Sequence, residues 1–520
     1  MKVLLITGLM AKESVEYNAK QSTVHTEVLA LKVPVAAFLT PQTISDAIKK
    51  MQLKDFDFIL VPGLIRCDTS VISKVTGVPA FKGPRYAADL PTVLDSLSEL
   101  TLSTVIPADE LLREKLKKKA FEEIAKVEED KKVLLKKPSN ILIKNLAVGK
   151  DFPMRVMGEI VDAALKPDEE IKRLAKHYVQ SGADVIDVGM IVGESRPKDA
   201  KRVVAAVKAA VNVPVSVDSL NPEEIKAAVY AGADLVLSVD AGNIKTIASF
   251  IRNVAVVAIP TNQKEGIFPK KPHERVQLLE EIIYEAKSLG VTKVLADLIL
   301  DPLDVLESFT AFRQFSERNP NVPLFVGISN VTELMDADSV GVNALLAKLS
   351  SEVGASMLLA TEKSDKARGT IKEESIAAKM MFLAKRRGSV PKDLGVDLLL
   401  FKDKRNREES YDKGLEQKTR VLVGSQEKTA ELDEKGSFRI FVDRQGKNII
   451  AEHFTLVDEA APSLIVKGKT AEQVFGVIVE SALVSKLDHV AYLGNELGKA
   501  EIALRTGKEY IQDKRMFGEQ

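Results

Sequence analysis

Between Phe152 and Arg387, a short β-rich run is followed by an amphipathic helical stretch eight times in succession. The β-rich runs are Arg155–Val161, Asp184–Gly189, Val213–Asp218, Leu235–Asp240, Val254–Ile259, Lys293–Leu300, Leu324–Ile328 and Ser356–Leu359. The helical stretches are Asp168–Gln180, Lys198–Val211, Pro222–Ala231, Ile244–Arg252, His273–Ser288, Leu303–Arg318, Ala337–Glu352 and Ile371–Lys385. Strand–helix alternation builds a parallel sheet, and eight units in about 235 residues match the size of a (β/α)₈ TIM barrel. A doubly wound open sheet is the alternative, but eight consecutive units favour closure of the barrel over residues 151–390.

The residues before the barrel predict two further parts. Residues 1–105 alternate strand-like and helical segments and predict an α/β layer domain. Its strands are expected at Val3–Thr7, Val33–Leu39 and Phe56–Pro62, with a helix at Pro41–Met51. Residues 106–150 predict a charged helical linker, because Ala108–Lys137 is rich in Lys, Glu and Leu and contains neither Gly nor Pro.

The residues after the barrel, 395–520, predict a separate α+β domain. Four alternating runs with polar turns indicate an antiparallel meander, and two helical stretches follow. The strands are expected at Thr419–Gly424, Ser437–Asp443, Ile449–Thr455 and Leu464–Gly468, and the helices at Ala471–Val484 and Leu493–Leu504.

Composition excludes several classes of function. Lys plus Arg and Asp plus Glu both number 74, so no overall charge favours nucleic acid or an anionic membrane. A single cysteine excludes an internal disulfide or a Cys-rich metal centre, and the five histidines lie far apart in sequence. We therefore expect no intrinsic metal. Without a signal peptide or a bilayer-length apolar run, the chain is expected in the cytoplasm.

Polar residues at the carboxyl ends of the predicted strands are the candidates for chemistry, because barrel active sites lie there. The second strand ends in Asp187-Val188-Gly189, and the third in Val217-Asp218-Ser219. Ser238-Val239-Asp240 closes the fourth strand, Asp297 lies in the sixth, and Ser329-Asn330 follows the seventh.

Several of these segments resemble known families. Gly182–Gly189 with the loop Gly193–Pro197, and Pro214–Ser219, resemble the second and third strands of dihydropteroate synthases. Gly327–Val331 is more similar to methyltetrahydrofolate:corrinoid methyltransferases of the same pterin-binding superfamily, and Met157–Glu159 is compatible with both. The matches run through the barrel in order at strand ends. As a whole the chain resembles archaeal dihydropteroate synthase-related proteins linked with methanopterin metabolism.

The resemblance implies a pterin at the barrel mouth, held by Asp218, Asp297 and Asn330, with Glu159, Ser238 and Asp240 as further contacts. A pterin edge presents an amino group and a ring N–H in parallel, which match the two oxygens of a carboxylate. Asp218, Asn330 and Arg196 are the expected catalytic residues. Other readings stay open for three of these positions. Asp218 could cap the next helix, Asp301 could replace Asp297, and Asn330 could form a local turn.

A synthase must also handle the departing diphosphate, for which Arg196, Ser195, Lys363 and Lys264 are the expected anion contacts. Mg²⁺ would be compatible with a diphosphate substrate. Dihydropteroate synthases carry Ser-Arg-Lys after the seventh strand and Arg-x-His after the eighth, where this chain has Ser329-Asn330-Val331 and Thr361-Glu362-Lys363.

Three functions therefore stay open. The first is a transferase that joins a pterin-methyl diphosphate to an arylamine in tetrahydromethanopterin- or folate-type cofactor metabolism. The second is methyl transfer between a reduced pterin and a corrinoid protein partner, and the third is a non-catalytic pterin-binding subunit. A homodimer is compatible with the resemblance.

Overall fold

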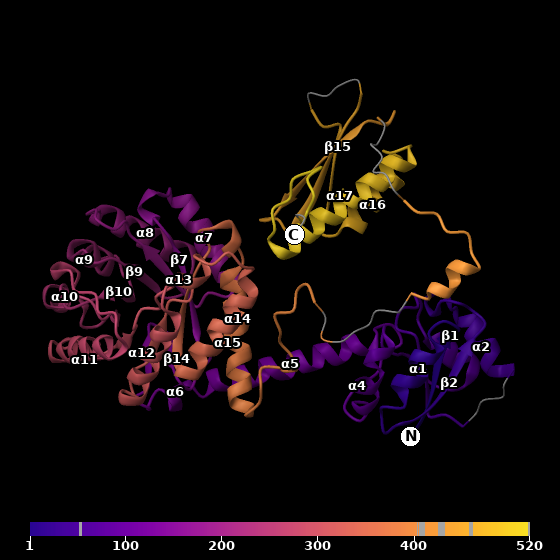
Figure 1. The fold of residues 1–520 in the computed structure, drawn as a ribbon, viewed down its shortest axis with the longest axis horizontal. Coiled ribbons are helices and arrows are strands. Elements are labelled where there is room, and N and C mark those ends of the chain that lie inside the picture. The colour runs from indigo at the N-terminus through magenta and orange to yellow at the C-terminus, as the bar shows by residue number, and fades with distance from the viewer. Residues whose placement is uncertain (51–54, 403, 405–410, 425–431, 457–460, 518–520) are drawn as a thin grey trace. The chain divides into compact units, whose positions relative to one another are not determined.

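The computed structural model describes residues 1–50, 55–402, 404, 411–424, 432–456 and 461–517 (Figure 1). The chain divides into two compact units, residues 1–409 and 410–520, each of which is treated by itself. The first unit contains a small parallel sheet and a closed barrel, and the second contains a three-stranded antiparallel sheet.

The N-terminal part is a three-layer α/β domain. Its parallel sheet has the order β2-β1-β3-β4, with bounds β1 Lys2–Gly8, β2 His25–Leu31, β3 Phe58–Val61 and β4 Ala80–Lys82. Its helices are α1 Lys12–Ala19, α2 Pro41–Lys50, α3 Ser70–Thr76 and α4 Leu90–Asp95. Residues of α2 and α3 pack with alternate strand residues such as Leu4 and Ile6, whereas α1 and α4 pack with Val3 and Leu5. The period of two along β1 therefore gives the sheet two buried faces.

One predicted strand in this domain is wrong. The first and third predicted strands and the helix after Pro41 are confirmed as β1, β3 and α2. The second strand is His25–Leu31 rather than Val33–Leu39, whose place is taken by a short 3₁₀ helix at Ala36–Phe38. His25–Leu31 forms an edge strand with alternating partial exposure, which weakens its apolar signal. Pro34 lacks the N–H that a strand in a ladder would donate.

The predicted linker is helical only in its first part. Helix α5 (Ala108–Glu129) and the short α6 (Lys131–Leu134) are followed by an antiparallel hairpin, β5 (Asn140–Ile143) and β6 (Leu146–Gly149). Ile143 and Val148 of the hairpin belong to the same buried cluster as the side chains inside the barrel. The hairpin therefore closes the amino-terminal end of the barrel, and the helical prediction for residues 140–149 is wrong.

The predicted barrel is confirmed. Eight parallel strands close in the order β10-β11-β12-β13-β14-β7-β8-β9. Their bounds are β7 Arg155–Ile160, β8 Val185–Gly189, β9 Val215–Asp218, β10 Leu235–Val239, β11 Ala255–Ala258, β12 Val294–Ala296, β13 Leu324–Val326 and β14 Ala355–Thr361. The surrounding helices are α7 Asp168–Ser181, α8 Pro197–Ala210, α9 Pro222–Tyr230, α10 Ile244–Ile251, α11 Pro272–Ser288, α12 Val305–Arg318, α13 Ser329–Thr332, α14 Ser339–Val353 and α15 Thr370–Arg387.

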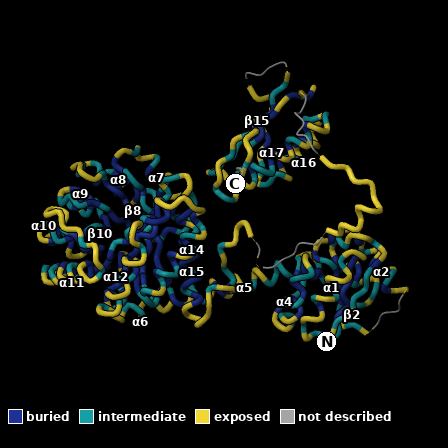
Figure 2. The backbone as a smooth tube through the Cα atoms, in the orientation of Figure 1, coloured by how far each residue is buried: buried dark blue, intermediate teal, exposed yellow. Residues whose placement is uncertain are grey.

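The interior of the barrel is a packed core below a polar mouth. Met157, Val185, Leu235, Phe325 and Met357 lie in one buried cluster inside the barrel. The buried segments run through the strands and the inner faces of the helices, as Figure 2 shows. Strands β7, β8 and β9 carry Glu159, Asp187 and Asp218 at or near their carboxyl ends. These polar residues therefore lie at the end of the barrel where the active sites of such barrels are found.

The second unit is an α+β domain. Strands β15 (Ser437–Asp443), β16 (Asn448–Phe454) and β17 (Leu464–Gly468) form an antiparallel sheet, and helices α16 (Ala471–Glu480) and α17 (Leu487–Thr506) pack on it. Three of the four predicted strands and both helices are confirmed. Thr419–Gly424 is not a strand, because no neighbouring segment pairs with it in the part of the chain that the structure describes.

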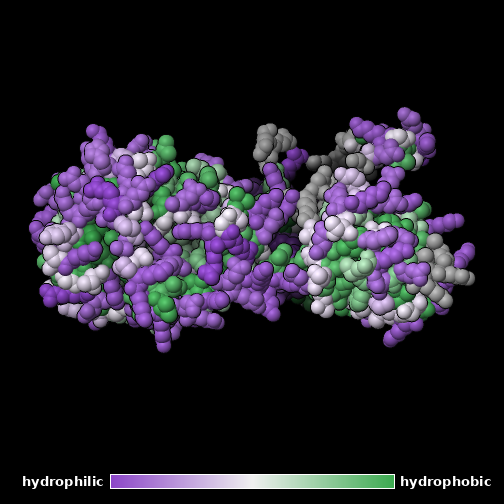
Figure 3. Space-filling model, turned by 90° about the horizontal axis from the view of Figure 1, so that it is seen from below, coloured by the Kyte–Doolittle hydropathy of each residue, from purple (hydrophilic) through white to green (hydrophobic). Residues whose placement is uncertain are grey.

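The surface carries both hydrophilic and hydrophobic side chains. On the face shown in Figure 3, hydrophilic side chains cover most of the barrel, and hydrophobic side chains gather on the N-terminal domain. No helix among the described residues has the length and apolar character needed to span a bilayer.

Candidate active site at the mouth of the barrel

Three neighbouring strands carry acidic side chains to the mouth of the barrel. Glu159 of β7 is in register with Asp187 of β8, and Asp218 of β9 is in register with Gly189, two residues further along β8. These residues continue the inward-facing period of two that begins with Met157 on β7 and Val185 on β8. The same alternation that fills the core therefore directs three carboxylates into the barrel.

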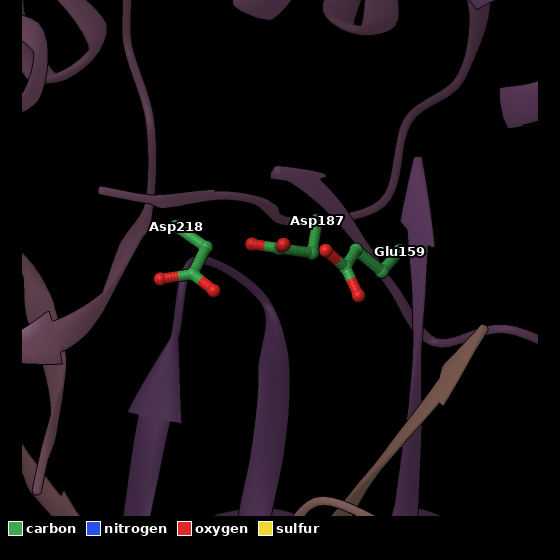
Figure 4. A group of neighbouring side chains, drawn as sticks. All are labelled: Glu159, Asp187 and Asp218. Carbon is green, nitrogen blue, oxygen red and sulfur yellow. The ribbon is translucent and has the colours of Figure 1, made fainter. Parts of the chain in front are cut away.

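The three side chains converge. One carboxylate oxygen from each of Glu159, Asp187 and Asp218 lies within 4.8 Å of the others (Figure 4). Ser216 donates a hydrogen bond from its hydroxyl to Asp187 Oδ1. Ser238 Oγ donates to Asp218 Oδ1 over 2.5 Å. Each aspartate thus keeps a second oxygen for another ligand.

Ser238 reaches Asp218 because strand β10 is irregular at this point. The pairing of β10 with β11 shifts register between Val236 and Val239, and Ser238 adopts a left-handed backbone conformation with φ +60°. In a regular strand Ser238 would face away from the interior, since Leu237 faces inward. The irregularity turns the hydroxyl toward the site, as bulges beside active sites commonly do.

The carboxylates hold protons more tightly than usual. Burial, reinforced by the charges of Asp218 and Asp162, raises the pKa of Glu159 to about 8. Burial and the charges of Asp218 and Glu159 raise the pKa of Asp187 well above its ordinary value. Burial also raises the pKa of Asp218, against the hydrogen bond from Ser238. Raised pKa values of this kind are typical of functional sites.

Asp297 completes the acidic mouth just beyond the end of β12. It is buried, and burial raises its pKa to about 7 although the backbone N–H of Ile299 donates to its Oδ1 over 2.8 Å. The charge of Asp218 contributes to the same rise, so the two carboxylates lie close enough to interact electrostatically. Ile299 has φ +63°, a rare conformation for a β-branched residue. Backbone strain of this kind gathers at functional sites.

Contacts in the structure bear on the alternatives that the sequence leaves open. Asn221, not Asp218, caps α9 by accepting from the N–H groups of Glu223 and Glu224. Asp301 lies 3.6–3.7 Å from the cationic nitrogens of Lys270 and Arg275, so its charge is compensated.

Asn330 lies in the one-turn helix α13, but its side chain bonds outside this segment. Its amide nitrogen donates to the carbonyl of Leu300 over 3.1 Å, across to the loop after β12. That bond fixes the amide beside the loop that also carries Asp297. The three residues expected to hold a pterin are therefore all at the mouth.

The expected anion contacts are exposed or paired with carboxylates. The guanidinium of Arg196 bonds Glu194 and lies 3.5 Å from Asp199. Lys363 Nζ lies 3.2 Å from Asp162 Oδ2. Ser195 and Lys264 are exposed on their loops.

Asp240 shapes its own loop. Its two carboxylate oxygens accept from the backbone N–H groups of Gly242, Asn243 and Gln263 and from the hydroxyl of Thr261. Through these bonds Asp240 holds the β10–α10 loop to the loop after β11, and its role as a pterin contact stays a prediction.

Two buried charged residues that sequence reasoning missed support the mouth. Arg275 is 4% exposed and donates to the carbonyls of Pro269 and Ile299. Glu224 accepts from the backbone N–H of Arg196 over 2.7 Å and from Ser219 Oγ over 2.5 Å. No local pattern distinguishes either residue from the exposed charges of its helix.

Comparison with known proteins relates separate parts of the chain to three families. Residues 162–360 match the family described as pterin binding enzyme, and residues 432–513 match PterinBD-DUF4346. Residues 1–85 match DUF6513, a family of unknown function.

Individual relatives cover different shares of the chain. The uncharacterized protein MJ0107 of Methanocaldococcus jannaschii is 41% identical over 535 aligned residues, which cover 99% of each chain. A Ycf91-like protein of Nostoc is 34% identical over 107 residues, covering 16% of this chain and 84% of its own. Xanthomonas albilineans dihydropteroate synthase, solved with indole-2-carboxylic acid and 6-chloroguanine, covers 49% of this chain and 99% of its own at 19% identity and a TM-score of 0.39. The chain therefore belongs, over its full length, to the family of the archaeal protein MJ0107, and its barrel is a member of the pterin-binding enzyme superfamily.

Proposed function

We propose that the barrel mouth binds a pterin and that the protein is a transferase of the dihydropteroate synthase type. In this proposal it joins a pterin-methyl diphosphate to an arylamine in folate- or tetrahydromethanopterin-type cofactor metabolism. The observation that carries the proposal is that Asp218 and Asp297 lie at the carboxyl ends of β9 and β12 and interact electrostatically, with Asn330 bonded to the loop that carries Asp297.

The pterin edge supplies hydrogen-bond donors for the carboxylates at the mouth. Its amino group and adjacent ring N–H are parallel donors, whereas the carboxylates of Asp218 and Asp297 are acceptors. Hydrogen bonds to an ionised carboxylate are shorter and roughly twice as strong as neutral ones. The Asn330 amide can both donate and accept, which suits the ring nitrogens and the carbonyl oxygen of the same heterocycle.

The transfer itself is a substitution at the methylene carbon of the pterin. The bond from that carbon to the diphosphate oxygen breaks, and the nitrogen lone pair of the arylamine forms the new bond. The amine then loses a proton, which solvent or a carboxylate at the mouth can accept. The main task of the barrel is to hold both substrates in line.

The test is diphosphate release by the full chain. Purified protein is mixed with a pterin-methyl diphosphate, Mg²⁺ and a panel of aminobenzoate derivatives, and diphosphate and the coupled product are measured. Asp218→Asn should reduce turnover strongly, whereas Asp336→Asn, a change at a fully exposed carboxylate, should not. Absence of diphosphate release with every amine would refute the synthase.

Methyl transfer from a reduced pterin to a corrinoid protein is the second candidate. It is favoured by the pairing of Arg196 and Lys363 with carboxylates, which leaves less cationic charge for a diphosphate. It is also favoured by Asn330, since an amide near the pterin can assist protonation of the leaving nitrogen. Transfer of a labelled methyl group to a reduced corrinoid would select this reaction. Tight pterin binding without either turnover would select the non-catalytic subunit.

A further inference from the structure

The group formed by Glu159, Asp187 and Asp218, here called the acidic triad, has no cationic partner. Among the residues that the structure describes, no Lys, Arg or His forms an ion pair with any of the three. The charge of Lys363 lowers the pKa of Glu159 at longer range, but its ammonium is paired with Asp162. Three carboxylates are thus held within 4.8 Å of one another in a partly buried site, and no ion pair with them is formed in the described part of the chain.

Asp187 is the member of the triad whose position is hardest to explain by contact with a pterin or with solvent. Its side chain is fully buried, and its Oδ2 atom has no hydrogen-bond partner in the described part of the chain. Figure 4 shows the Asp187 carboxylate lying between those of Asp218 and Glu159. A buried acceptor without a donor is costly, and each such atom in a native protein needs an explanation.

We propose that the acidic triad is a binding site for one hard divalent cation of the Mg²⁺ or Mn²⁺ type. Carboxylate oxygens are the ligands that these cations prefer, and no sulfur or imidazole ligand is present in the triad. Oxygens that share one octahedral cation at about 2.1 Å lie about 3 Å apart when adjacent and about 4.2 Å apart when opposite. The three triad oxygens, all within 4.8 Å of one another, can reach such positions by side-chain adjustment.

The residues around the triad leave room for a cation. Ser216 donates to Oδ1 of Asp187, and Ser238 donates to Oδ1 of Asp218. The Oδ2 atoms of both aspartates therefore remain available to one external ligand. Gly189 contributes by having no side chain, because a Cβ atom there would lie 2.5 Å from Glu159 Oε1. The Glu159 carboxylate can therefore extend over β8 toward Asp187.

The single cysteine and the scattered histidines exclude a Cys- or His-rich metal centre but not an all-carboxylate site. Three protein oxygens fill half of an octahedral shell and leave the other positions for water or substrate. If the proposed synthase is right, the diphosphate of the substrate can take these positions. The cation then compensates the charge that the paired Arg196 and Lys363 do not. That role rests on the proposed function, whereas the binding site does not.

The experiment is a titration of the full chain with Mn²⁺ alone, after treatment with a chelator and without any pterin. Bound and free Mn²⁺ are distinguished by electron paramagnetic resonance, because the sharp signal measured in solution comes from the free ion. We expect saturable binding of one Mn²⁺ per chain that Mg²⁺ displaces. Glu159→Gln and Asp187→Asn should each weaken it by at least about tenfold, because each removes a charged ligand. The control Asp336→Asn removes an equal charge from the same end of the barrel and should bind as the unchanged protein does.

Thermal unfolding keeps the test decisive if one variant folds poorly. Mn²⁺ should raise the midpoint of the unchanged protein and of Asp336→Asn, but not that of Glu159→Gln. The proposal is overturned if the unchanged protein binds no Mn²⁺ at millimolar concentration, or if both triad variants bind it as tightly as the control. A pterin titration in the presence of chelator reports on the proposed function separately, since it does not require the metal.

Discussion

Asp297→Asn should make the protein more stable at alkaline pH while weakening its affinity for a pterin. In the folded state burial raises the pKa of Asp297 to about 7, about three pH units above that of an unfolded aspartate. The folded protein therefore retains a proton that the unfolded chain has lost, and stability falls as pH rises from about 4 to 7. At about 1.4 kcal/mol per unit, the penalty above pH 7 is about 4 kcal/mol. Asparagine is uncharged at every pH and can still accept the hydrogen bond from Ile299, so it removes the penalty.

The measurement is urea unfolding between pH 4 and pH 8.5 in the presence of a chelator. It is followed by circular dichroism, because the chain has no tryptophan. The variant and the unchanged protein should unfold at similar urea concentrations near pH 4–5, and the variant should become the more stable of the two by up to about 4 kcal/mol near pH 8. The exposed Asp336→Asn should show no such crossover.

Pterin affinity gives the second half of this prediction. Only the ionised Asp297 is a pure acceptor, so affinity should rise as pH passes through about 7, and Asp297→Asn should lose about 1.5–3 kcal/mol of binding and the pH dependence with it. A stability gain with a binding loss is the usual trade-off at a functional site. If the variant is less stable at pH 8, or binds a pterin unchanged, the reasoning about Asp297 is wrong.

Three other changes test the structure around the site and beyond it. Arg275→Met removes the buried guanidinium that lies near Asp301 and donates to two loop carbonyls, so thermal unfolding should show a loss of about 3–5 kcal/mol; a neutral result would contradict its supporting role. Phe325→Ala empties a fully buried position inside the barrel and should cost about 3–5 kcal/mol in urea unfolding, with the N-terminal domain unaffected. Gly436→Ala places a Cβ atom 1.9 Å from the carbonyl oxygen of Phe454 at a residue with φ +118°, so the second unit alone should lose at least about 1–3 kcal/mol, measured by hydrogen exchange of β15 and β16. Unchanged protection in those strands would refute it.

The barrel was predictable because the sequence patterns that specify its strands and helices are local. Each strand has its own apolar run and each helix its own amphipathic period, and eight repeats leave few topologies that can accommodate them. The position of Asp218, Asp297 and Asn330 at strand ends followed from the same alternation, since parallel strands in a barrel end at one face. The strand at His25–Leu31 and the β5–β6 hairpin were missed for the complementary reason. Their stability comes from partners elsewhere, namely β1 for the strand and the barrel interior for the hairpin.

What the sequence by itself determined is therefore the order of the elements, the closed barrel and the set of polar residues at its mouth. Only the tertiary structure decided which of those residues meet. The stagger between β7, β8 and β9 brings Asp187 between Glu159 and Asp218, and the irregularity in β10 turns Ser238 inward. Folding also paired Arg196 and Lys363 with carboxylates. These outcomes depend on strand register and on contacts between distant segments. The hydrophobic period along a single strand (two residues) or helix (3.6 residues) does not predict either of them.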